Sequence, residues 1–156
     1  MKIAGEALNG RSGHEAGRAL LDRLYREETG MDCPEIAVAE RGKPYFVNSP
    51  LHFSISHTKR HVFCALGDRP VGLDAEEMDR KADLRLAERI LSASEKRHFD
   101  AAADKQTCLL RLWVLKEAAA KLTGEGLRGF PNHTDFDPND PRIMEMDGCY
   151  VAVFTE

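Results

Sequence analysis

Residues 107–126, TCLLRLWVLKEAAAKLTGEG, decide the fold that we expect, because they join a buried helix to a charged face. Residues 108–115 contain a single polar residue, Arg111, which predicts burial on nearly all sides, as in the central helix of a domain. Trp113, Glu117 and Lys121 follow one another at intervals of four residues, which stacks their side chains on one helix face. On a solvent-exposed helix the pair of Glu117 and Lys121 would contribute only about 0.2–0.5 kcal/mol to the stability of the helix. Whether the pair of Glu117 and Lys121 is functional therefore depends on the groups that this helix face contacts.

A strand predicted over residues 71–76, VGLDAE, supplies groups that the helix can face. Asp74 and Glu76 are two residues apart, so their side chains share one face of the strand. Neighbouring carboxylates repel unless a cation or proton lies between them, and oxygen ligands without nearby Cys or paired His favour Mg²⁺ over zinc. The alternative is that both acids end an edge strand in water. Glu117 as a third ligand favours the metal site.

The turn Arg41-Gly42-Lys43-Pro44 ends a strand predicted over residues 36–40. It is either a simple turn or an anion-binding loop. Glycine lets backbone N–H groups approach a phosphate, while Arg and Lys neutralise its charge.

Polar side chains also gather at the end of the strand predicted over residues 51–58. Ser56, His57 and Thr58 form a run of hydrogen-bonding groups at a junction between strand and turn. A lone histidine is usually structural, but functional groups concentrate at such junctions. His57 is therefore a candidate site residue.

Composition limits the class of protein. The chain has 156 residues, of which 42% are hydrophobic and 31% charged, which suits one ordinary core or two small halves that share one. No apolar run approaches the roughly 20 residues of a membrane span, and no signal peptide is recognised, so we expect a cytoplasmic protein that binds no membrane. The net charge of -4 argues against general nucleic-acid binding. The four scattered cysteines predict reduced thiols, with no disulfide and no zinc site.

Local signals predict the remaining elements. Ser12 with Glu15, and Ser92 with Glu95, have the capping-box spacing that begins a helix. The other predictions are strands over residues 2–8 and 61–66, one helix over 84–91, and a closing hairpin of 143–146 with 149–154.

Four motifs in order, GKPYF (42–46), FSISHT (53–58), VGLDAEE (71–77) and WVLKEAAAKLTGEGL (113–127), resemble those of 4'-phosphopantetheinyl transferases of the surfactin-synthetase-activating (Sfp) type. The similarity runs from about Glu15 to Leu127, and the last two motifs are specific in combination. The resemblance implies the α+β fold of the holo-acyl-carrier-protein synthase superfamily, with two similar halves related by a pseudo-twofold axis. Coenzyme A would bind in the cleft between them. The halves would be residues 1–68, with the nucleotide end and His57, and residues 69–156, with the metal-binding carboxylates and the charged helix.

Enzymes of this family transfer the 4'-phosphopantetheine arm of coenzyme A to a serine of an apo carrier protein, use Mg²⁺ and release adenosine 3',5'-bisphosphate. The matched positions imply that Mg²⁺ is held by Asp74, Glu76 and Glu117. Glu117 would also act as the base, directly or through water, and Lys121 and His57 would contact phosphate oxygens. The expected coenzyme A contacts are Arg41, Gly42, Lys43, Pro44, Ser56, His57 and Lys121.

The chain departs from the family pattern in two ways. Ser54 stands where the family has Asn before the Ile-Ser-His run. The segment before Ser12 is short, so we expect either a minimal monomer or a cleft completed by a partner or second copy. Two other functions stay open: a non-catalytic module that binds coenzyme A or a carrier protein, and a different Mg²⁺-dependent phosphotransferase.

Overall fold

The computed structural model describes residues 1–126 and 134–156, so Leu127, where the predicted similarity ends, lies outside them. These residues form a mixed structure of helices and strands, which confirms the predicted class at this level. The strands are β1 (Lys2–Ala7), β2 (Ile36–Val38), β3 (Pro44–Phe46), β4 (His52–His57), β5 (His61–Gly67), β6 (Val71–Glu77), β7 (Ile143–Met146) and β8 (Cys149–Thr155). The helices are α1 (Gly13–Thr29), the 3₁₀ helix η1 (Leu84–Leu86), α2 (Ala87–Ile90), α3 (Ala93–Ala101) and α4 (Lys105–Thr123).

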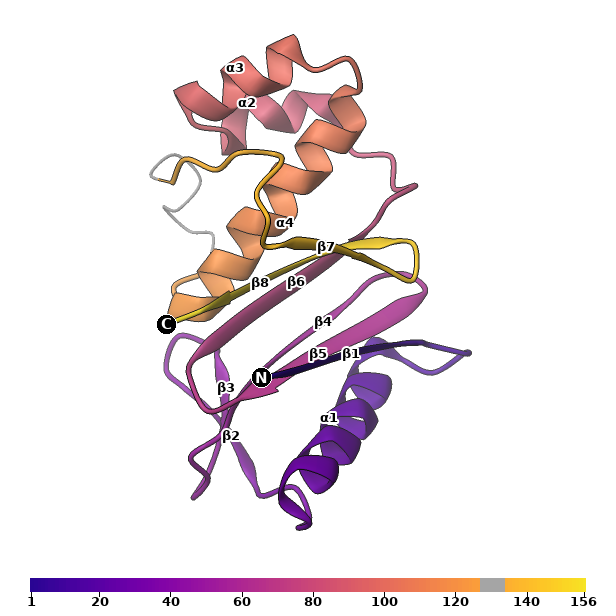
Figure 1. Cartoon of the computed structure of the whole chain (residues 1–156), viewed down its shortest axis with the longest axis vertical. Coiled ribbons are helices and arrows are strands. Elements are labelled where there is room, and N and C mark those ends of the chain that lie inside the picture. Colours follow the sequence, from indigo (N-terminus) through magenta and orange to yellow (C-terminus); the bar gives the residue numbers. More distant parts are fainter. Residues whose placement is uncertain (127–133) are drawn as a thin grey trace.

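The strands lie in the middle of the molecule, with α1 at one end of its long axis and α2 and α3 at the other (Figure 1). One antiparallel sheet has the order β1-β5-β4 and a second has the order β6-β8-β7, while β2 and β3 pair separately. Helix α1 packs on the first sheet and α4 on the second. Each three-stranded sheet therefore carries one long helix.

Local signals determine where α1 begins and ends. The Ser12 hydroxyl accepts a hydrogen bond from the Glu15 amide at 3.1 Å, and the Glu15 carboxylate accepts one from the Ser12 amide, as the predicted capping box requires. The helix ends at Gly30, whose φ of 72° is a conformation that glycine adopts at little cost. Its apolar face is buried against the first sheet through Ala16, Leu20, Leu21 and Leu24.

Helix α4 is buried along most of its length, as its sequence predicts. It lies against β6 and β8, and the approach to β6 is closest at Gly72. A Cβ atom on Gly72 would overlap backbone atoms of Ala118 and Leu122. Glycine at this position therefore allows the charged face of α4 to reach the carboxylates of β6.

Serine side chains join β4 to β6 where the two sheets meet. The hydroxyl of Ser54 accepts a hydrogen bond from the Leu73 amide at 2.9 Å, and that of Ser56 accepts one from the Ala75 amide at 3.3 Å. Buried backbone N–H groups need a partner, and these hydroxyls provide it. Ser54, a departure from the family pattern, is thus part of the junction between the sheets.

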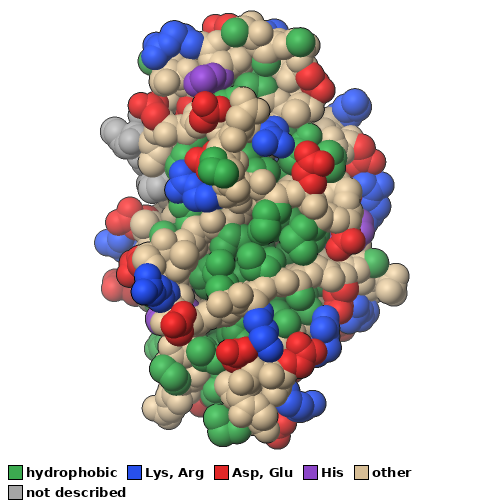
Figure 2. All heavy atoms as spheres, in the orientation of Figure 1, with side chains coloured by type: hydrophobic (Ala, Val, Ile, Leu, Met, Phe, Trp, Pro, Cys, Tyr) green, Lys and Arg blue, Asp and Glu red, His purple; other side chains and the backbone are tan. Residues whose placement is uncertain are grey.

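An apolar cluster fills the space between the sheets on the faces that carry no helix. It is built from Phe63 and Ala65 of the first sheet and residues of β6 and β8 of the second. Figure 2 shows hydrophobic side chains gathered in the middle of this view of the molecule, over the strands. The partly buried hydrophobic residues that pack against the cluster are Ile3, Met144 and Met146.

The prediction of one helix over residues 84–91 was wrong. The segment forms η1 and then the short helix α2, which ends at Leu91 in an extended conformation. Ser92 is also extended, with ψ of 170°, because its hydroxyl and amide cap α3 through Glu95. A continuous helix through residue 91 is incompatible with that cap. Within the described part of the chain, none of the helices combines the length and the apolarity that crossing a membrane would need.

Candidate active site

Asp74 and Glu76 project from one face of β6 into a cavity of about 980 Å³. The apolar residues that alternate with them lie in the cluster between the sheets: Val71, Leu73 and Ala75. Asp74 accepts hydrogen bonds from Lys121 Nζ at 2.7 Å and from the Ser56 hydroxyl at 2.9 Å. Glu76 accepts one from the Trp113 indole N–H at 3.1 Å and pairs with the Arg80 guanidinium. Both carboxylates are thus held in place by neighbouring donors.

The charged face of α4 turns toward these two carboxylates. Trp113 reaches Glu76, Lys121 reaches Asp74, and Glu117 lies between them on the helix and lines the same cavity. Four-residue spacing on a helix and two-residue spacing on a strand have therefore brought all five side chains together.

Glu117 differs from the other two carboxylates because it makes no hydrogen bond or ion pair with any residue that the structure describes. Burial raises its pKa to about 7, and the nearby negative charge of Asp74 adds to the increase. Burial likewise raises the pKa of Glu76. A half-buried carboxylate without a partner, beside two others, is a donor set that suits a hard divalent cation such as Mg²⁺.

The three carboxylates are not gathered as tightly as the ligands of one ion. Among the described residues, the group of three potential metal ligands whose atoms all lie within 4.8 Å of one another is a different one, consisting of His61, Glu77 and Cys149. Lys121 and Arg80 neutralise Asp74 and Glu76 in this structure. A divalent ion in this cavity would therefore share Asp74 with Lys121 and Glu76 with Arg80.

His57 is exposed and lines the cavity beyond the carboxylates. Its ring packs against Gly13 in the first turn of α1, where a Cβ atom would overlap the imidazole. Histidine and the carboxylate cluster thus face one space from the two different sheets.

The basic turn lines a second, smaller cavity of about 260 Å³ that shares Ile55, Glu117 and Lys121 with the first. Its lining includes the whole predicted turn, Arg41, Gly42, Lys43 and Pro44. The sequence-predicted residues therefore lie along one continuous region, although they come from distant segments.

Lys43 has contacts that the sequence did not predict. Its ammonium donates to the carbonyl of Leu122, near the end of α4, at 2.6 Å and to that of Val71 at 3.3 Å. Burial lowers its pKa. Arg41 is more exposed and pairs with Glu125 at 3.1 Å. Through these hydrogen bonds, Lys43 connects the basic turn to β6 and to α4.

The sequence profile of the 4'-phosphopantetheinyl transferase superfamily matches residues 70–146. A 4'-phosphopantetheinyl transferase of Bacillus subtilis is 39% identical over 116 residues, which cover 71% of this chain and 51% of that protein. The chain belongs to the 4'-phosphopantetheinyl transferase superfamily. Psf-1 of Bacillus pumilus is 34% identical over 71% of this chain and 49% of its own length, and Sfp of Bacillus subtilis strain 168 is 35% identical over 70% and 49%. The chain spans about half the length of the curated superfamily members it matches.

Several residues around the candidate active site were not predicted from the sequence. Arg80 comes from the segment after β6, and nothing in its spacing points to Glu76. Lys116 adjoins Glu117 in the helix motif but is fully buried and pairs with Glu95 of α3 at 2.8 Å. The position of Lys116 inside an otherwise apolar run could have indicated such a pair. A buried charge needs an opposite charge beside it.

Proposed function

We propose that this chain transfers the 4'-phosphopantetheine arm of coenzyme A to a serine of an apo carrier protein, and its relatives' name, 4'-phosphopantetheinyl transferase, supports this class of reaction. The observation that carries the proposal is Glu117, which has no hydrogen-bond or ion-pair partner among the described residues and lies beside Asp74 and Glu76 in a cavity that Lys121 and His57 also line. The superfamily membership supports the same reaction.

In this proposal Asp74, Glu76 and Glu117 hold Mg²⁺, which supplies positive charge to the pyrophosphate of coenzyme A when bound. Lys121 lies beside Asp74 and contributes a further positive charge to the phosphates. His57 contacts phosphate oxygens from the opposite side of the cavity. Arg41 and Lys43, with the backbone of Gly42 and Pro44, bind the nucleotide end in the smaller cavity.

Ser56 has a second role in this arrangement. Its hydroxyl donates to Asp74 and accepts from the Ala75 amide, so it orients the carboxylate as well as lying near coenzyme A. An oriented carboxylate needs less rearrangement when its ligand arrives.

The reaction needs a base for the serine hydroxyl of the carrier. The serine oxygen attacks the β-phosphorus, the bond to the oxygen between the two phosphates breaks, and adenosine 3',5'-bisphosphate leaves. Glu117 accepts the serine proton directly or through water. Its pKa is about 7 in the metal-free protein, and a bound Mg²⁺ would lower it, so the carboxylate would be ionised and able to accept a proton.

The division of the chain follows from the same proposal. Residues 1–68 form the half that carries the basic turn and His57, and residues 69–156 form the half that carries the carboxylates and α4. We propose that the halves are related by a pseudo-twofold axis, with coenzyme A between them, and that the enzyme works as a cytoplasmic monomer without nucleic acid or membrane.

Mass spectrometry tests the proposed transfer. Several apo carriers, of the acyl, peptidyl and polyketide kinds, are incubated with the protein, coenzyme A and Mg²⁺. We expect at least one carrier to gain the mass of one phosphopantetheine, and Asp74→Asn to abolish the gain. Binding of coenzyme A without mass gain on any carrier would instead support the non-catalytic module. Stabilisation by ATP but not by coenzyme A would support a different phosphotransferase.

A further inference from the structure

A second cluster of metal-binding side chains lies on the opposite face of β6 from the proposed Mg²⁺ site. Glu76 faces the large cavity, and its neighbour Glu77 projects toward the apolar space between the sheets, because successive strand residues point to opposite faces. Cys149 is the register partner of Glu77 on β8, and His61 begins β5. Three strands from both sheets thus supply Glu77, Cys149 and His61 to one place.

The ligand atoms of this cluster are close together, and two of the three side chains, Glu77 and Cys149, are buried. All three ligand atoms lie within 4.8 Å of one another. His61 Nδ1 is 3.4 Å from Glu77 Oε1 and 3.8 Å from Cys149 Sγ. Cys149 is fully buried and Glu77 is 5% exposed, so the packing around these two side chains fixes their positions.

Arg60 does not block the cluster. Its guanidinium binds Glu77 through Oε2, whereas Oε1 faces His61 and accepts hydrogen bonds from the Thr58 hydroxyl at 2.6 Å and the Arg60 backbone N–H at 3.0 Å. Carboxylates that bind metals are commonly oriented by such outer hydrogen bonds. Arg60 also pairs with Asp79 at 2.7 Å, which offsets its positive charge.

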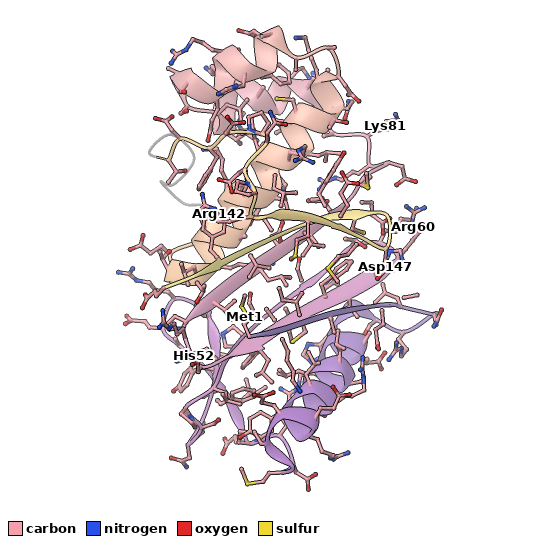
Figure 3. All side chains as sticks on the ribbon, in the orientation of Figure 1. Met1, His52, Arg60, Lys81, Arg142 and Asp147 are labelled. Atoms are coloured by element: carbon pink, nitrogen blue, oxygen red, sulfur yellow. The ribbon has the colours of Figure 1, made fainter. Side chains whose placement is uncertain are left out.

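The surrounding charge favours a cation. Figure 3 shows Arg60 and Asp147 on the same side of the molecule, where the hairpin of β7 and β8 turns. Glu77 and Asp147 both act electrostatically on Cys149. Among the charged groups around the cluster, Glu77, Asp79 and Asp147 outnumber Arg60. A thiolate, an imidazole and one carboxylate form a softer donor set than the three carboxylates across the strand.

We propose that His61, Glu77 and Cys149 form a binding site for a transition-metal ion of the Zn²⁺ type, separate from the carboxylate site. The ion takes Nδ1, Oε1 and Sγ, with water as a fourth ligand, and the thiol proton is released to solvent on binding. Because the ligands come from both sheets, the ion cross-links them. The proposal departs from the sequence-based expectation of no zinc site, which considered only the spacing of the cysteines along the chain.

Cobalt(II) spectroscopy tests the site directly. The reduced, metal-free protein is titrated with Co²⁺ and with Zn²⁺, without coenzyme A or Mg²⁺, so the result does not depend on transferase activity. We expect one Co²⁺ per chain with a near-ultraviolet thiolate-to-cobalt charge-transfer band. Zn²⁺ at about 100 times its dissociation constant should raise the melting temperature by about 5–10 °C.

Matched variants locate the bound ion. Cys149→Ser should lose the band, whereas Cys33→Ser, which alters a more accessible cysteine, and Asp74→Asn, which alters the other site, should keep it. His61→Gln retains the thiol and should lose the Zn²⁺-dependent rise in melting temperature, which tests the site even if Cys149→Ser does not fold. Absence of the band in the unmodified protein, or its survival in a folded Cys149→Ser variant, would overturn the proposal. So would a full rise in His61→Gln.

Discussion

The three carboxylates of the candidate active site lie in different electrostatic environments. Asp74 has Lys121 and Ser56, and Glu76 has Arg80 and Trp113, but Glu117 has no partner among the described residues. Burial and like charge make the ionised form of Glu117 costly in the metal-free protein. The residue proposed to be most useful in the reaction is therefore one that opposes folding.

Glu117→Gln should stabilise the metal-free protein at high pH. The folded pKa of about 7 exceeds the ordinary value of 4.5, so the folded state binds more protons between these values and stability falls as pH rises through them. In chelator at pH 8 we expect a gain of roughly 1–3 kcal/mol in the free energy of unfolding, measured with urea, and little gain at pH 4.5. A loss of stability at pH 8 would contradict the assigned environment.

Activity should separate Glu117 from Lys121. Single-turnover transfer should fall by roughly 10²–10⁴-fold in Glu117→Gln, as for a lost general base, and by roughly 10²–10³-fold in Lys121→Met, as for a lost charge-stabilising donor. Lys121→Met should also lower stability, because it leaves Asp74 without its cation. Full activity in both variants would contradict the prediction and would mean that Glu117 and Lys121 form only an ordinary surface ion pair.

Lys43→Met tests two roles of one side chain. Loss of the bonds to Leu122 and Val71 should cost about 1.5–3 kcal/mol of stability, which an exposed control, Lys96→Met, should not. If the ammonium also contacts the 3'-phosphate, the KM for coenzyme A should rise more than the KM for dephospho-coenzyme A. Equal changes with both substrates would leave Lys43 a purely structural residue.

At the scale of elements, the contact between α4 and β6 determines the geometry of the site. The helix supplies Glu117 and Lys121, the strand supplies Asp74 and Glu76, and Gly72 sets the distance between them. Since the atoms nearest to Gly72 belong to backbone, they cannot move aside as a side-chain end could.

Gly72→Ala should therefore damage both stability and catalysis. We expect about 3 kcal/mol or more of destabilisation, from the overlap with Ala118 and Leu122, and a loss of transfer as Lys121 leaves Asp74. Gly67→Ala is the matched control, because its Cβ atom would lie 3.4 Å from Met1 Cβ and should cost less than about 1 kcal/mol. Thermal melts and single-turnover assays of both variants measure the difference, and similar stabilities would contradict this reading of the contact.

At the scale of the whole molecule, a few polar side chains connect the two sheets. Ser54 and Ser56 bond from β4 to β6, and Lys43 bonds to the second sheet and its helix. Glu77 of β6 accepts hydrogen bonds from Thr58 and Arg60 of the first half of the chain. Burial by itself would raise the pKa of Glu77, but these bonds lower it to about 2.

Glu77→Gln should weaken the connection between the sheets in a pH-dependent way. A lowered folded pKa gives stability that is present above the ordinary pKa of 4.5 and is lost as pH falls toward about 2. At pH 7 we expect the variant to lose about 2–3 kcal/mol in the free energy of unfolding, and its difference from the unmodified protein to close as the pH falls to about 2. Asp32→Asn, in the exposed pair with Arg26, should change stability by less than about 1 kcal/mol. A gap that stays constant with pH would contradict the charge-based role.

Much of this molecule could be predicted without coordinates, because the signals were local. The capping boxes at Ser12 and Ser92 place the starts of α1 and α3, and alternation along residues 71–76 places Asp74 and Glu76 on one face. The failure at residues 84–91 arose where a helical apolar pattern competed with the cap of the next helix. Periodicity reports which face is apolar, but it does not report where a cap interrupts the backbone.

By itself, the sequence determined most of the elements and the faces on which the charged residues stand, since each depends on neighbours within a few positions. Its four motifs carried the family resemblance. Only the tertiary structure decided the partners that are distant in the sequence: Lys43 on the carbonyls of Val71 and Leu122, and His61 beside Glu77 and Cys149. These pairings join residues from different elements, and their geometry follows from how the two sheets and α4 pack. Spacing along the chain carries no record of that packing.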